Sequence, residues 1–208
     1  MKILEPKISM IENHVLLDSI KEKEFSNKIY ENSLIDNEKI VGITFDSCIF
    51  KNIDFSNILL KDIDLLDCIF ENCDLSNKVF DNKLIERIKF INCKMVGISF
   101  IGTIFKDILL NNCKLNYVNF SDAKIKNMII EDSNLSESTF YETNIKNLEL
   151  NRVDFSNVEV IGTSLKDIDF SSSIIHNIKV DNYSIKGMII DRYQSQELVR
   201  ILGVEIKE

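Results

Sequence analysis

The chain contains 208 residues with a formal net charge of −8, and 45% of its residues are hydrophobic. Its single proline and six glycines exclude collagen-like and proline-rich chains, and its hydrophobic fraction excludes extensive disorder. No apolar stretch approaches the roughly 18 residues of a membrane span, and the first residues lack a secretory signal pattern, so we expect a cytoplasmic protein without a membrane partner.

Residues 1–42 are predicted to form an N-terminal cap. Apolar or aromatic residues recur here every five positions, at Phe25, Tyr30, Ile35 and Ile40. The position two residues before each of them, which is small and apolar in later repeats, is instead occupied by Lys23, Lys28, Ser33 and Glu38. An open solenoid end would expose core and unpaired strand edges, so atypical repeats are expected to cover it.

Residues 43–190 carry an apolar residue at every fifth position without one slip. The series begins with Phe45, Phe50, Phe55, Leu60, Leu65, Phe70, Leu75 and Phe80, and it ends with Phe170, Ile175, Val180, Ile185 and Ile190. A smaller residue usually stands two places earlier, as at Ile43, Cys48, Ile53, Ile58 and Ile63. Neither a helix nor a flat strand has a period of five, and an unbroken repeat of this length predicts one elongated solenoid.

The same spacing predicts a four-sided coil. One inward side chain per five residues suits a chain that turns a corner after each short extended segment, and four such segments close one turn. Residues twenty apart would then stack about 4.8 Å apart, as in a parallel sheet. Two series at that interval agree with this expectation: Cys73, Cys93 and Cys113 before the centres, and Asn52, Asn72, Asn92 and Asn112 at the expected turns.

The cysteines and histidines give little sign of chemistry. All five cysteines occupy the smaller inward position, where cysteine behaves as a small buried hydrophobe, and no spacing suits zinc. Metal binding or disulfide formation is the lesser alternative, and His14 and His176 are expected to be surface residues. We therefore expect no metal and no cofactor.

Two lysines interrupt the inward pattern within residues 77–87. Lys78 and Lys83 occupy the smaller inward position in successive repeats. A charged lysine is costly in a dry core, so either the coil bulges there or the ammonium groups reach out at the corners. A functional loop is the alternative.

Residues 191–208 break the repeat and are predicted to form a helix followed by a short strand. The helical spacing involves Tyr193, Leu198, Val199, Ile201 and Leu202, with Gly203 as a stop, and Val204 and Ile206 alternate with charged residues. The segment is either a lid on the last coil or the interface of a homodimer.

The charges are unevenly placed around the predicted coil. The side centred on Leu60, Phe80, Phe100, Phe120, Phe140, Val160 and Val180 carries the acidic residues Asp62, Asp81, Asp122, Glu142, Glu159 and Asp181. The side centred on Phe50 and Phe70 carries Glu71, Glu131, Asp132, Glu149, Asp169 and Asp191. A third side carries the lysine column, which consists of Lys106, Lys126, Lys146, Lys166 and Lys186. Stacked lysines repel one another unless neighbouring carboxylates such as Asp107 and Asp167 screen them.

Several segments resemble the A(D/N)LxX pattern of pentapeptide repeat proteins. They are CDLSNKVF, CKLNYVNF, SNLSESTF and SLKDIDF, and the resemblance covers nearly the whole chain. It implies a right-handed quadrilateral parallel β-helix, an all-β fold with, in this chain, a short C-terminal helix.

Within that family the chain looks like the Qnr-type quinolone-resistance proteins of the loop-free Gram-positive kind. The resemblance rests on overall length, FENCDLSN followed by FINCKMVGISF, and the ending from TSLKDIDFSSS to GMIIDRYQSQELVRILGVEIKE. It implies an acidic mimic of the DNA duplex that binds DNA gyrase or topoisomerase IV and protects them from fluoroquinolones. It also implies a homodimer through the tail, with interface residues Tyr193, Leu198, Val199, Leu202, Val204 and Ile206. The inserted loops that some members use for this contact are absent.

The residues bear on three possible functions: an enzyme, a topoisomerase-binding protein and a scaffold. No Ser/His/Asp or Cys/His constellation and no glycine-rich phosphate loop is visible, and a filled coil leaves no substrate pocket, so we expect a non-enzymatic protein without a small-molecule ligand. The leading hypothesis is topoisomerase binding through the acidic sides, with no direct contact to nucleic acid, because the lysine column lacks interleaved aromatic residues. The alternative is a structural or protein-interaction scaffold with an unrelated partner.

Overall fold

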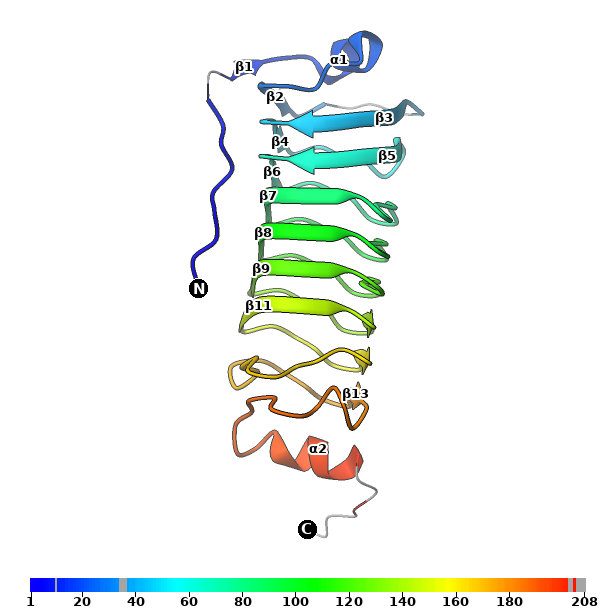
Figure 1. Cartoon of the computed structure of the whole chain (residues 1–208). Helices are drawn as coiled ribbons and strands as arrows, with labels where there is room; N and C mark the ends of the chain where they lie inside the picture. The colour runs from blue at the N-terminus through cyan, green and yellow to red at the C-terminus, as the bar shows by residue number, and fades with distance from the viewer. Residues whose placement is uncertain (10, 34–36, 202–203, 205–208) are drawn as a thin grey trace.

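The structure is a computed structural model that describes residues 1–9, 11–33, 37–201 and 204. The chain winds into a narrow rod of stacked coils, with α1 at one end and α2 at the other (Figure 1). The strands are β1 (Glu12–Asn13), β2 (Lys28–Glu31), β3 (Lys39–Asp46), β4 (Ile49–Lys51), β5 (Leu59–Leu66), β6 (Ile69–Glu71), β7 (Leu84–Ile91), β8 (Ile104–Asn111), β9 (Lys124–Glu131), β10 (Thr139–Tyr141), β11 (Asn144–Asn151), β12 (Glu159–Ile161) and β13 (Lys179–Val180), and the helices are α1 (Leu16–Glu22) and α2 (Ser195–Ile201).

All strand pairs are parallel, and from β2 onward paired residues are twenty apart. Phe50 pairs with Phe70, Phe70 with Phe90, and Ile85 with Phe105. The predicted quadrilateral parallel β-helix is therefore confirmed. We number its sides by their inward centres: side 1 contains Phe45, Leu65, Ile85, Phe105, Ile125, Ile145, Leu165 and Ile185, and sides 2, 3 and 4 contain the residues five, ten and fifteen positions later.

Most corners are formed by a residue with a positive φ angle, two places after a centre. Asn52, Asp62 and Asn72 have φ angles of 53°, 55° and 53°. Asparagine and aspartate tolerate this left-handed conformation better than most side chains do. Their side chains also bond from coil to coil, since Asn72 Nδ2 donates to Asn52 Oδ1 at 3.0 Å. The sequence prediction that the asparagine series marks turns is confirmed.

At two corners, glycine leaves room for an asparagine side chain of the neighbouring coil. Gly97 and Gly102 have φ angles of 67° and 66°, and a Cβ atom would lie 2.7 Å and 2.5 Å from the Oδ1 atoms of Asn77 and Asn82 in the coil above. A larger residue would displace these asparagine side chains.

The core is a continuous stack of large side chains. Phe50, Phe70 and Phe90 stack on side 2 with ring centroids 4.8 Å and 5.1 Å apart. On side 4, Phe120 and Phe140 stack at 4.9 Å. Close packing of these rings leaves the interior filled along the rod axis.

Polar side chains at the smaller inward position donate hydrogen bonds to backbone carbonyls of the coil above. Cys68 Sγ donates to Phe45 O at 3.3 Å, and Thr143 Oγ1 donates to Phe120 O at 2.8 Å. All five cysteines are free and buried, as predicted, and burial raises the pKa of the Cys68 thiol well above its ordinary value. Cysteine, serine and threonine thus share one role, in which a short donor satisfies a buried carbonyl.

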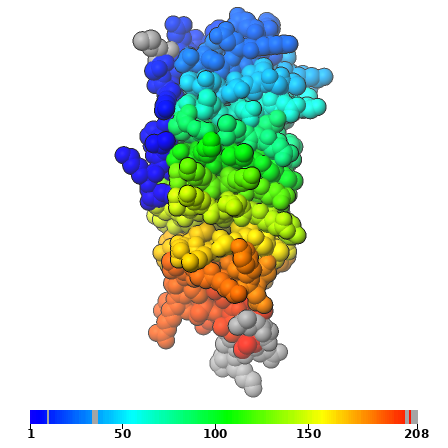
Figure 2. Space-filling model, viewed as in Figure 1, coloured from blue at the N-terminus to red at the C-terminus, as the bar shows by residue number. Residues whose placement is uncertain are grey.

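The N-terminal region caps the rod, and its first nine residues run along the outside. Phe25 and Tyr30 are buried, and Tyr30 Oη bonds Ser19 Oγ in α1 at 2.7 Å. Residues 1–9, which we call the strap, lie against the coils (Figures 1 and 2). The strap was not predicted from the sequence. Cap, coils and tail form one continuous stack, so the boundaries at residues 42 and 190 stay predictions.

Corner carboxylates hold the strap by its backbone. Lys7 N donates to Asp67 Oδ1 at 2.7 Å, and Leu4 N donates to Asp107 Oδ1 at 3.2 Å. Because Asp67 and Asp107 lie two coils apart, the strap runs parallel to the rod axis. Within the strap, the side chain of Ile3 is buried, at 8% exposure.

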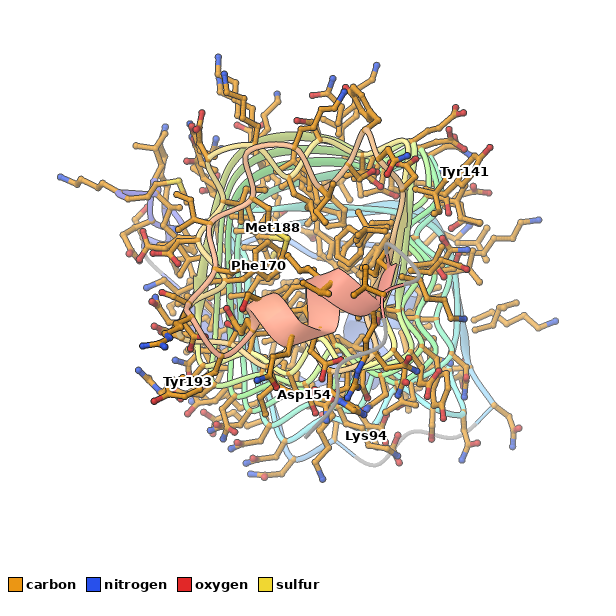
Figure 3. The ribbon with its side chains drawn as sticks, turned by 90° about the horizontal axis from the view of Figure 1, so that it is seen from below. Lys94, Tyr141, Asp154, Phe170, Met188 and Tyr193 are labelled. Carbon is orange, nitrogen blue, oxygen red and sulfur yellow. The ribbon has the colours of Figure 1, made fainter. Side chains whose placement is uncertain are left out.

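The tail closes the other end of the rod. Gln194, which is 9% exposed, donates through Nε2 to Phe170 O at 2.8 Å and Ser173 O at 2.6 Å. Seen along the axis, α2 lies across the mouth of the last coil (Figure 3). The predicted helix is confirmed, although it begins only at Ser195. Leu202, Gly203 and Ile206 lie outside the described residues.

Removing one stacked ring should destabilise the rod. We expect Phe70→Ala to lower the free energy of unfolding by about 3–5 kcal/mol, because it leaves a cavity between Phe50 and Phe90. The control Leu59→Ala removes a side chain that is 49% exposed and should change it by no more than about 0.5 kcal/mol. Urea unfolding followed by circular dichroism measures both; equal losses would contradict the filled core.

Candidate functional site

Three acidic residues of side 4 form the candidate binding surface. Asp122, Glu142 and Glu159 are exposed and belong to successive coils, and within the described residues their carboxylates have no ion pair or hydrogen bond. Asp122 and Glu142 occupy consecutive left-handed corners, with φ angles of 58° and 48°. The corner geometry points these two carboxylates away from the rod.

The other three acidic residues predicted on this side have structural partners. Asp62 pairs with Lys83 Nζ at 3.0 Å, and this hydrogen bond and charge lower the pKa of its carboxyl. Asp81 Oδ1 accepts from Ser99 Oγ at 2.6 Å and from Ile101 N at 2.9 Å. The carboxylates of Asp62 and Asp81 therefore bind groups in the neighbouring coil, which leaves them less available to a partner protein.

Asp181 closes a turn at the lower end of side 4. Its carboxylate accepts from Ser184 N at 2.6 Å, from Gly162 N at 2.8 Å and from Tyr183 N at 3.0 Å. Hydrogen bonds from the Ser184 and Gly162 backbones lower the pKa of this carboxyl. Of the six predicted residues, the structure therefore leaves only Asp122, Glu142 and Glu159 unpaired.

Lys78 on side 4 and Lys83 on side 1, the two lysines that interrupt the inward pattern, lie where the coil opens without a shift of the repeat. Lys78 Nζ donates to Ser56 O at 2.8 Å and Ile58 O at 3.0 Å, carbonyls that would otherwise face the next coil. Leu84 N bonds Asp64 Oδ1 at 2.8 Å instead of a backbone carbonyl. Pairing resumes at Leu65 and Ile85, twenty residues apart. The ammonium groups do reach outward, as one of the two sequence alternatives expected.

Side 2 is a weaker candidate, because much of its acidic set is occupied. The N-terminal ammonium pairs with Glu149, and Glu131 accepts from Asn111 Nδ2 at 2.6 Å. Arg152 makes two hydrogen bonds to Asp132, at 2.6 Å and 2.7 Å. The strap adds an ion pair between Glu5 and Lys89 on the same side.

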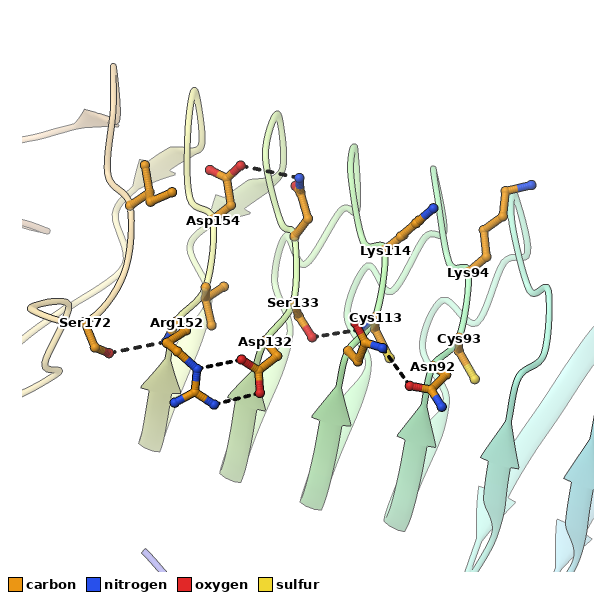
Figure 4. Close-up of a pocket in the computed structure, with 14 residues that line it drawn as sticks. Asn92, Cys93, Lys94, Cys113, Lys114, Asp132, Ser133, Arg152, Asp154 and Ser172 are labelled. Atoms are coloured by element: carbon orange, nitrogen blue, oxygen red, sulfur yellow. Dashed lines mark hydrogen bonds and ion pairs between the residues drawn. The ribbon is translucent and has the colours of Figure 1, made fainter.

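An open groove runs along the corner between sides 2 and 3 (Figure 4). Its charges are mostly paired within the rod: Lys94 Nζ donates to Asp74 Oδ2 at 2.8 Å, and Arg152 binds Asp132. Asn134 Nδ2 donates to Asp154 Oδ2 at 3.4 Å, from one coil to the next along the groove. These contacts join successive coils and form no catalytic constellation.

Neither a metal site nor a membrane span is found in the described part of the chain. No cluster of three or more His, Cys, Asp and Glu side chains there could hold a metal ion. No described helix is long and apolar enough to cross a bilayer. His176 Nδ1 lies 3.3 Å from Glu197 Oε1 at the tail, and His14 lies 3.6 Å from Glu22 at the cap.

The tail residues predicted at a dimer interface divide into two groups. Tyr193 is 83% exposed and Val204 is 50% exposed, whereas Leu198 packs partly against the core. Val199 is partly buried. Leu202 and Ile206 lie outside the described residues.

Comparison with known proteins identifies the repeat. A family model for the pentapeptide repeat region matches residues 63–140, and one for eight copies of the pentapeptide repeat matches residues 133–171, so that together they span more than half of the chain. The chain belongs to the pentapeptide repeat family. A family model for the SV2A/B/C luminal domain also matches residues 18–100, which are less than half of the chain.

Solved structures of other pentapeptide repeat proteins are similar at low sequence identity. QnrB1, a plasmid-mediated fluoroquinolone resistance protein, is 22% identical over 88% of this chain and 92% of its own, with a TM-score of 0.44. HetL from the cyanobacterium Nostoc sp. strain PCC 7120 is 14% identical over 84% of this chain and 92% of its own, with a TM-score of 0.42. No significant match is found among curated protein sequences.

The hydrogen-bonded turn at Asp181 predicts a pH-dependent contribution to stability. Because the folded pKa is lowered, this contribution is present above the unfolded pKa of about 3.9 and is lost as the pH falls through the folded value. Asp181→Asn should lower the melting temperature at pH 7, since an amide NH₂ then faces Gly162 N–H, and the deficit should shrink below about pH 4.

The control for that variant is Asp122→Asn, which removes an unpaired carboxylate of the same side. It should leave the melting temperature unchanged at pH 7. Equal melting temperatures for the Asp181 and Asp122 variants across this pH range would show that the turn does not stabilise the rod.

Proposed function

We propose that this protein is a non-enzymatic DNA mimic that binds DNA gyrase or topoisomerase IV and protects these enzymes from fluoroquinolones. The observation that carries the proposal is the row of unpaired carboxylates Asp122, Glu142 and Glu159 on side 4 of a narrow rod. A groove that normally holds a DNA duplex is cationic, and a rigid row of negative charge can bind there in place of phosphates. The motif resemblance to quinolone-resistance proteins supports this choice of partner.

The rod suits this role physically because its charges are preorganised. Corner carboxylates project from a backbone that is hydrogen-bonded to the following coil: Asp122 N donates to Tyr141 O at 2.8 Å, and Glu142 N donates to Ile161 O at 2.9 Å. Little conformational entropy is lost when such a surface meets its partner. Contacts of this kind should speed association and weaken as salt concentration rises.

Charge reversal tests this surface directly. The triple variant Asp122→Lys, Glu142→Lys and Glu159→Lys should lose inhibition of gyrase supercoiling by at least about tenfold, because like charges then oppose a cationic groove. It should also lose protection in drug-stabilised cleavage reactions. The measurements are titrations of purified protein into both assays.

A control of equal charge uses carboxylates on other parts of the rod. Glu12→Lys, Glu137→Lys and Asp167→Lys change the net charge by the same amount and should retain inhibition. Equal loss in both triple variants would show that net charge rather than side 4 matters. Wild-type protein without effect at micromolar concentration would favour a scaffold with an unrelated partner.

We further propose that two copies join end to end through the tail, which would lengthen the acidic surface. Tyr193 and Val204 expose apolar surface there, and Ile189, four residues before Tyr193 in the chain, is 46% exposed. Burying such surface in a symmetric contact is favourable, and a two-fold contact closes after two copies.

Sedimentation velocity tests the dimer. Tyr193→Asp should convert dimer to monomer, because it would place a charge in a buried interface. Tyr117→Asp changes a tyrosine that is 63% exposed at mid-rod and should leave the dimer intact. A monomeric wild-type protein would refute the interface.

A further inference from the structure

The lysine column lies on side 1 and is more open than the sequence indicated. Lys106, Lys126 and Lys146 are register partners on β8, β9 and β11, and Lys166 and Lys186 continue the series. Lys106 pairs with Glu86 at 3.1 Å. The other four are exposed and, within the described ranges, have no ion pair.

The expected screening of these charges is incomplete. Asp107 is only 8% exposed, and its Oδ1 atom accepts from Leu4 N and from Asn127 Nδ2, at 3.2 Å and 3.0 Å. It is therefore bound to the strap and to the next coil instead of to a lysine. Four adjacent positive charges about 4.8 Å apart repel one another, and an anion that lay along them would relieve this repulsion.

The surroundings of the column favour phosphate over a protein partner. Lys124 adds a further exposed cation, and its register partner Asn144 is polar. Between Ile104 and Tyr183, side 1 exposes no large apolar side chain among the described residues. A protein interface usually has an apolar or aromatic centre, whereas interfaces with nucleic acid are more polar and more positively charged.

We propose that the lysine column binds the phosphate backbone of duplex DNA without reading its sequence. The column is straight and about 19 Å long at the strand spacing, so it can follow the backbone over about five or six base pairs. Lysine offers a point charge without the planar fork that reads bases, and backbone binding needs no aromatic residues. The sequence expectation of no nucleic-acid contact considered only base stacking.

The net charge of −8 opposes this contact at long range but not at short range. Salt at 0.1 M screens charges beyond about 10 Å, so the lysines nearest the phosphates dominate once the surfaces meet. The resulting binding is weak and strongly salt-dependent. It does not depend on the topoisomerase proposal, since it uses a different side of the rod and is measured without that enzyme.

The test is fluorescence anisotropy with a labelled duplex of about 20 base pairs over a range of potassium chloride concentrations. Each phosphate contact contributes about −0.9 to the slope of log K against log salt, so four or five lysines predict a slope near −4. The variant K126Q/K146Q/K166Q should bind at least about tenfold more weakly, and its slope should be smaller in magnitude by about 2.7.

The matched control K39Q/K61Q/K179Q removes three exposed, unpaired lysines outside the column and should retain both affinity and slope. Thermal melting of both variants checks that they are folded. No binding by the wild type at about 20 mM salt, or equal weakening in the two variants, would overturn the proposal. Single-stranded DNA that bound tenfold more tightly than duplex would also overturn it, because base contacts would then dominate.

Discussion

At most of its corners the coil requires a residue with a positive φ angle, and the rest of the molecule depends on this requirement. Asparagine, aspartate and glycine meet it easily, whereas Arg87 and Tyr117 adopt φ angles of 53° and 62° at a cost of roughly 1–2 kcal/mol each. The corner also directs its side chain outward. The same constraint that folds the chain therefore places charges such as Asp122 at regular heights on the surface.

Corner side chains then connect the coils. Arg87 makes two hydrogen bonds to Asp67, at 2.7 Å and 2.8 Å, and Asn147 Nδ2 donates to Asn127 Oδ1 at 2.8 Å. Burial tends to raise the pKa of Asp67, but the hydrogen bonds from Arg87 and from Lys7 N lower it overall. Because these charges are satisfied inside the rod, a count of acidic residues overstates the charge that a partner meets.

The five-residue spacing was sufficient to predict the fold because it determines both the turn and the core. It predicted the stacking of Phe50 on Phe70 and the burial of the cysteines, since both follow from residues twenty apart. It could not predict that Cys68 donates to Phe45 O, because hydrogen-bond direction does not appear in a hydrophobic pattern. The outward position of the Lys78 ammonium group was predicted only as one of two alternatives, the other being a bulge of the coil.

The candidate surface was less predictable than the fold. The sequence predicted six acidic residues on side 4. Asp62 and Asp181 differ from Asp122 because their carboxylates bind Lys83 and Gly162 N, which are about twenty residues away in the chain. No short motif records such contacts. The strap was missed for the same reason: Leu4 N bonds Asp107 Oδ1, more than a hundred residues away.

The strap constrains the spacing between two coils of the rod. The core could accommodate an additional coil of twenty residues, because each coil repeats the packing of the one above it. The strap could not accommodate it, because the backbone amides of Leu4 and Lys7 bind carboxylates that lie two coils apart. Duplicating a coil between Asp67 and Asp107 would therefore break one of these two contacts, so the N-terminal segment fixes the number of coils between the two carboxylates.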